Sequence, residues 1–130
     1  MVKWPEHGFL DDDTEGENIL YWRASTLWKL SETMKIEYVP LDSFDWTNEN
    51  FQCGNLSNPP LWRDIGNHAK QIFNADLQYP IIISAKGHVM DGMHRILKAY
   101  VFALPTIKAV RFRQDPPPDM IVPIEEAEER

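Results

Sequence analysis

The chain has 130 residues, of which 43% are hydrophobic and 25% are charged. These are the proportions of a globular protein, and the length fits one domain. The formal net charge of −7 disfavours duplex nucleic acid unless a local basic patch overrides the field. Four cations could supply such a patch, although spread cations are also typical of a solvated face: Lys98, Lys108, Arg111 and Arg113.

The single cysteine, Cys53, cannot form an internal disulfide, and no basic start leads into a long apolar run as in a secretory signal. No apolar run approaches the roughly 20 residues that span a bilayer. The sequence therefore predicts a soluble, cytoplasmic protein without a membrane segment. Cys53 lies in a polar stretch without neighbouring cations, so we interpret it as an ordinary loop cysteine.

The first half of the chain predicts an arm, a helix, a strand and a long loop. Residues 1–16 combine proline, glycine and three aspartates, which favours a loop or a loosely docked arm. From Asn18 to Met34 the apolar residues recur at three- and four-residue steps, which predicts a helix, interrupted near Ser25. Alternation over residues 35–41 predicts a strand. Residues 42–60 are typical of a loop or lid.

The second half predicts two helices and three strands of one sheet. Asn58 can cap a helix that ends near Asn74 and buries a stripe at Leu61, Ile65, Ala69 and Ile72. Three short, β-rich segments follow at residues 81–83, 88–90 and 106–112, and a helix precedes the last of them. The expected fold is α+β, a small mixed sheet flanked by helices over residues 17–113, with arms at 1–16 and 114–130.

Two glycines, two histidines, an aspartate and an arginine fall within residues 87–95, at the junction of a predicted strand and helix. The sequence there is Gly-His-Val-Met-Asp-Gly-Met-His-Arg. The first amides of a helix lack partners within it and carry the positive end of the macrodipole, so phosphate binds there readily. Gly92 would let a ligand approach the backbone, and His94 and Arg95 could reach phosphate oxygens. A purely structural alternative stays open, in which Asp91 caps the helix, Gly92 makes the turn and His94 lies in the core.

A metal site is the other alternative for this stretch. His88, Asp91 and His94 follow one another at three-residue steps. A strand-turn-helix path would scatter their side chains, so the sequence favours no metal here.

The apolar strand at 81–83, Gly87 and the Asp91-Gly92-Met93-His94-Arg95 element together resemble the ParB amino-terminal and sulfiredoxin superfamily. The resemblance covers residues 35–113. It implies a ParB/sulfiredoxin-like fold whose helix start binds nucleotide or phosphate. Family members include nucleotide-dependent DNA-partition proteins, free-serine kinases and sulfiredoxins.

The resemblance implies that Gly92, Met93, His94 and Arg95 form the phosphate or nucleotide site, with ATP, ADP or CTP as cofactor, with or without Mg²⁺. Asp91 would shape the turn or place a metal-bound nucleotide. In the serine-kinase branch a carboxylate from the early strand acts as base, and Glu37 stands at a comparable place. As catalytic candidates, Asp91 and Glu37 would serve a small-molecule phosphotransferase or a nucleotide hydrolase.

Two branches of the superfamily are disfavoured. Sulfiredoxin chemistry needs a cysteine nucleophile in this turn, where the chain has Met93, so that activity is not expected. The helical DNA-binding domain that follows in partition proteins is not matched after Arg113, so specific DNA binding is not expected either.

A few other residues are candidates for the same site. His68 and Lys70 lie on the helix before the strand, but their helical phases differ, so both cannot face one ligand. Arg63 and Asp64, near the start of that helix, are alternatives, although a solvated ion pair is the favoured interpretation of these two residues. Trp46 or Trp62 could stack on a base, although tryptophans usually fill cores and interfaces.

Two functions therefore compete. The first is an enzyme or switch that binds a phosphate-bearing small molecule at Asp91–Arg95. The second is a non-catalytic module that keeps the fold and binds a protein partner, or a second copy of itself, through its tryptophans and acidic ends.

Overall fold

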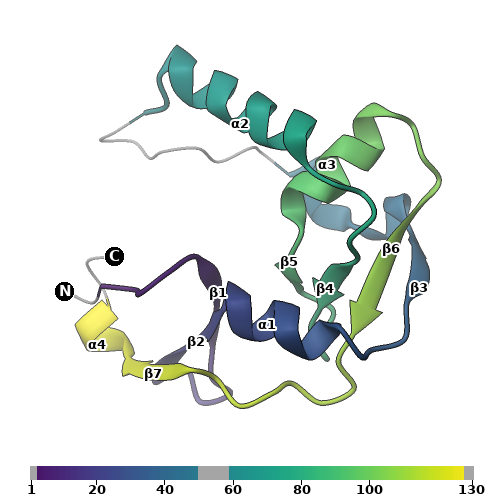
Figure 1. Ribbon diagram of the computed structural model, residues 1–130. Helices are drawn as coiled ribbons and strands as arrows, with labels where there is room; N and C mark the ends of the chain where they lie inside the picture. The colour runs from purple at the N-terminus through teal and green to yellow at the C-terminus, as the bar shows by residue number, and fades with distance from the viewer. Residues whose placement is uncertain (1–2, 50–58, 128–130) are drawn as a thin grey trace. The chain divides into compact units, whose positions relative to one another are not determined.

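The computed structural model describes residues 3–49 and 59–127 and has a mixed α+β fold (Figure 1), which confirms the predicted class. The chain divides into two compact units. The first comprises Met1–Lys35, Ile82–Asp91 and Val110–Arg130, and the second comprises Ile36–Ile81 and Gly92–Ala109. Each unit combines separate stretches of chain, an organisation that no composition shift along the sequence could reveal. Within the described residues, no helix is both long and apolar enough to cross a bilayer.

The first unit contains an antiparallel sheet in the order β1-β2-β7, built from β1 (Gly8–Asp12), β2 (Asn18–Arg23) and β7 (Met120–Pro123). The prediction of loose arms was therefore wrong at residues 8–12 and 120–123. In both segments, aspartates and prolines flank the short apolar runs, so the local sequence resembles a loop. Both strands form by pairing with β2.

The predicted helix from Asn18 was also wrong over its first turns, because residues 18–23 form β2 and the helix α1 spans Ala24–Ser31. The β-branched and aromatic side chains Ile19, Tyr21 and Trp22 are buried in β2, as suits a strand. A hydrophobic cluster of the first unit is made of Trp22, Leu27, Ile82, Met90 and Val110.

The second sheet has the strand order β3-β6-β4-β5. Its strands are β3 (Glu37–Pro40), β4 (Ile81–Ile83), β5 (Val89–Asp91) and β6 (Thr106–Arg111). In the second unit β3 pairs antiparallel with β6, and in the first unit β4 pairs antiparallel with β5. The prediction that segments 81–83, 88–90 and 106–112 belong to one sheet is confirmed.

The second unit carries the helices α2 (Trp62–Asn74) and α3 (Met93–Val101), which lie against each other (Figure 1). The predicted buried stripe of α2 was wrong. Leu61 and Ile65 are 56% and 52% exposed, and the half-buried side contains Asp64, His68 and Ile72. The true inner side includes polar residues, which the apolar pattern could not indicate.

The predicted loop at 42–60 contains two short 3-10 helices, η1 (Leu41–Ser43) and η2 (Asp45–Asn48), with Phe44 buried between them. Asn58, expected to cap α2, and Cys53 lie outside the described residues. The residue before α2 is Leu61, whose backbone N–H donates to the Asp64 carboxylate at 2.6 Å.

Candidate functional site

The predicted strand-turn-helix path is confirmed, and Gly92 forms the turn between the strand and the helix. Strand β5 ends at Asp91, and Gly92 precedes α3 with φ 110° and ψ 18° in the left-handed region. A Cβ built on Gly92 would lie 2.5 Å from Cγ2 and 2.9 Å from Cβ of Ile81. Both the backbone conformation and the contact with Ile81 therefore require glycine.

The start of α3 presents backbone donors. The amides of Arg95 and Ile96 donate to the Gly92 carbonyl at 3.0 and 3.1 Å, which closes the first turn. The amides of Met93 and His94 precede these bonds and have no acceptor within the helix. No acidic residue occupies the first turn and no side chain caps it, so α3 itself supplies no negative charge to its positive end.

His94 meets a second imidazole from α2. The ring centroids of His68 and His94 lie 5.7 Å apart with their planes at 38°, and both residues are half-buried. Lys70, two positions further along α2, is exposed, as the difference in helical phase predicted. The second unit thus brings together two of the residues that the sequence singled out, His68 and His94.

Arg95 holds the backbone that enters β4. Its Nη1 donates to the carbonyl of Pro80 at 2.6 Å and to that of Tyr79 at 3.2 Å. The sequence predicts this guanidinium as a phosphate ligand, and in the structure its Nη1 also positions the Tyr79–Pro80 segment.

Lys98 binds the carboxyl end of α2. Its Nζ donates to the carbonyls of Phe73 at 2.8 Å and Ala75 at 2.6 Å, groups that α2 leaves without partners at its end. Sequence reasoning assigned Lys98 to a diffuse basic patch and missed this role, because a backbone acceptor leaves no trace in the sequence.

We expect Lys98→Met to lower the free energy of unfolding by about 1–3 kcal/mol, because two backbone carbonyls, of which the Ala75 carbonyl is in a partly buried bond, lose a charged donor. The mutation keeps most of the aliphatic stem, so packing is largely preserved. Urea unfolding of wild type and variant measures the loss. Lys70→Met, on the exposed side of α2, is the matched control and should change stability little. Equal effects of the two substitutions would contradict the capping role.

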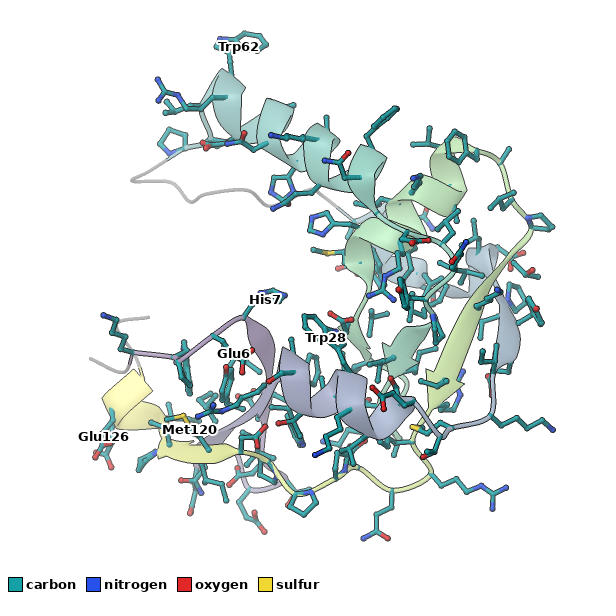
Figure 2. The ribbon with its side chains drawn as sticks, in the orientation of Figure 1. Glu6, His7, Trp28, Trp62, Met120 and Glu126 are labelled. Atoms are coloured by element: carbon teal, nitrogen blue, oxygen red, sulfur yellow. The ribbon has the colours of Figure 1, made fainter. Side chains whose placement is uncertain are left out.

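Asp91 is held by a tryptophan of the first unit. The indole Nε1 of Trp28, on α1, donates to Oδ2 of Asp91 at 2.8 Å. Figure 2 shows Trp28 projecting from α1, and its side chain is 52% exposed. Helix α3 begins at Met93 with Gly92 as its N-cap residue, so Asp91 lies one residue before the N-cap position.

The other predicted residues lie elsewhere. Glu37 opens β3 opposite Ala109 and is exposed. Asp64 accepts the bond from Leu61 described above, and Arg63 is exposed. His88 contacts Asp11, with Nδ1 3.6 Å from Oδ2 in the first unit. In the described ranges, no three His, Cys, Asp or Glu side chains form a group that could hold a metal ion.

Comparison of the chain with family models, with curated proteins and with solved structures finds no match.

Proposed function

We propose that the second unit binds the phosphate group of a nucleotide, or of another phosphate-bearing small molecule, at the start of α3. The observation that carries the proposal is the pairing of His68 and His94 beside a helix that begins at a left-handed glycine. Imidazole N–H groups and helix amides are both donors that suit phosphate oxygens.

The roles within this site follow from the contacts. The amides of Met93 and His94 face a bound oxygen, and the two imidazoles donate from the side. Arg95 has a second role beside its proposed contact with phosphate, because its bonds to the Tyr79 and Pro80 carbonyls hold that segment against the start of α3.

The ligand class is the one implied by the resemblance to the ParB and sulfiredoxin superfamily: ATP, ADP or CTP, with or without Mg²⁺. Transfer of the phosphoryl group to a small acceptor is the reaction that this resemblance implies, with Asp91 and Glu37 as candidate carboxylates. Met93 offers a thioether in place of a thiol, so sulfiredoxin chemistry forms no part of the proposal.

We expect a bound nucleotide to raise the melting temperature by several degrees. At about 100 times its dissociation constant, a ligand adds roughly 2.7 kcal/mol to the free energy of unfolding. Thermal melts of the wild type with ATP, ADP, CTP and GTP, with and without magnesium, measure the shift.

His68→Ala and His94→Ala should each reduce the shift, and Lys70→Ala should leave it unchanged, which separates a located site from general loss of positive charge. Arg95→Ala is a poorer test, since it also removes the bonds to Tyr79 and Pro80. If no nucleotide shifts the wild type, or if the double histidine variant responds fully, the proposal fails.

A further inference from the structure

Helix α2 exposes a line of apolar side chains to solvent. Trp62, Ile65 and Phe73 are 92%, 52% and 76% exposed, and Ala69 lies between them at the same helical phase. Figure 2 shows Trp62 extending outward from the amino end of α2. Spacings of three, four and four residues place these four side chains in one stripe along the helix, which we call the α2 stripe.

Cations border the α2 stripe. Arg63 and Lys70 are exposed and follow Trp62 and Ala69 by one residue, so they lie along one edge of the stripe. The Lys98 ammonium lies 6.0 Å from the Phe73 ring and 5.9 Å from the Phe102 ring, which continues the apolar surface onto the end of α3. The one acidic residue of the two helices, Asp64, is on the half-buried side. This border is cationic although the whole chain carries a net charge of −7.

We infer that the α2 stripe docks an acidic amphipathic helix of a partner protein. A stripe of helical period is complementary to the apolar face of another helix, and exposed Trp, Phe and Arg side chains are the types that anchor protein interfaces. Carboxylates flanking the partner's apolar face would meet Arg63 and Lys70. This complementarity selects the sign of the partner's charge.

The same charges disfavour two other occupants. Two copies of α2 packed stripe to stripe would bring their cationic edges together while each chain carries −7. An anionic membrane surface is extended and would meet the net negative charge of the whole chain, whereas a single acidic helix meets mainly the cationic edge within one Debye length of the stripe. The docking surface is also separate from the proposed phosphate site, because His68 points from another side of α2, toward His94.

Three synthetic peptides of equal length test the inference with the full chain. Each is a helix-forming sequence with leucines at helical spacing, flanked by glutamate, lysine or glutamine, and binding is followed by NMR titration at low salt. We expect the glutamate peptide to bind at least tenfold more tightly than the lysine peptide. Trp62→Ala should weaken it tenfold or more, whereas Tyr38→Ala, which removes another exposed aromatic side chain on β3, should change it less than twofold.

The double substitution Arg63→Gln and Lys70→Gln should reduce the affinity for the glutamate peptide to that for the glutamine peptide. His94→Ala should leave it unchanged, so failure here and failure of the phosphate proposal are distinguishable. Absence of saturable binding at millimolar peptide, or equal binding of all three peptides, overturns the inference. Sedimentation showing a dimer that Trp62→Ala dissociates would assign the stripe to a second copy, and Trp62-dependent binding to phosphatidylserine vesicles would assign it to a membrane.

Discussion

Gly92→Ala should lower the free energy of unfolding by about 2–5 kcal/mol, the sum of backbone strain and a steric clash. At φ 110° a side chain is strained in any surroundings, and here its Cβ would also lie within 3.2 Å of three atoms of Ile81. Ile81 is fully buried, so neighbouring atoms oppose a shift of its side chain away from the new Cβ. Equilibrium denaturation of the purified variant measures the loss.

Gly87→Ala is the matched control. Gly87 also has a positive φ, of 92°, but a Cβ there would have nothing within 4 Å. This variant should show the backbone strain alone, about 1–2 kcal/mol. The difference between the two substitutions isolates the contact with Ile81. If Gly92→Ala is no more destabilising than Gly87→Ala, the close approach of Gly92 to Ile81 is not a constraint on the fold.

Deletion of residues 115–130 should abolish cooperative unfolding of the first unit. The deletion removes β7 and the Pro116 carbonyl, which accepts from the Trp22 indole at 2.8 Å. It also removes Asp119, whose carboxylate accepts from the Arg23 amide at 2.8 Å and from the Thr26 hydroxyl at 3.2 Å at the start of α1. Trp22 is 3% exposed, so its N–H would be buried without a partner.

Far-UV circular dichroism and tryptophan fluorescence during a urea titration follow this loss. A synthetic peptide of residues 115–127 added in trans should restore the transition, because the missing strand and the Asp119 carboxylate return together. The same peptide with Asp119→Ala should restore it less well, since the loss of a hydrogen bond to a charged group costs about 1.5–3 kcal/mol. A truncated chain that unfolds as cooperatively as the full one would show that β7 is dispensable.

The elements that sequence reasoning found are those with local signals. Three signals each depend on only a few neighbouring residues, and each coincides with an element or a boundary of the structure. They are the β-branched run Ile81–Ile83, the glycine turn before α3 and the proline before β6. The pattern of residues 18–34 predicts a helix interrupted near Ser25, because apolar residues of a strand can fall by chance at helical spacing; the structure has β2 before that point and α1 from Ala24.

Non-local partners explain what was missed. The Trp22–Pro116 and Arg23–Asp119 bonds join residues 94 and 96 positions apart, so no window on the sequence could show that Pro116 and Asp119 bond to β2 or that residues 120–123 form a strand beside it. In the candidate site, His94 and the turn at Gly92 were predictable. The bonds of Arg95 and Lys98 to backbone carbonyls were not, because the acceptors belong to no particular residue type.

The position of β2 between β1 and β7 also bears on how the chain folds as it is synthesised. The hairpin of β1 and β2 leaves the ribosome well before β7, so the β2 edge that β7 covers stays open until residues 120–123 emerge. Closing that loop of roughly 100 residues is slow compared with local helix formation. The nascent chain therefore exposes an unpaired strand edge while the residues between β2 and β7 are translated, and binding of a chaperone to this edge would protect it from aggregation.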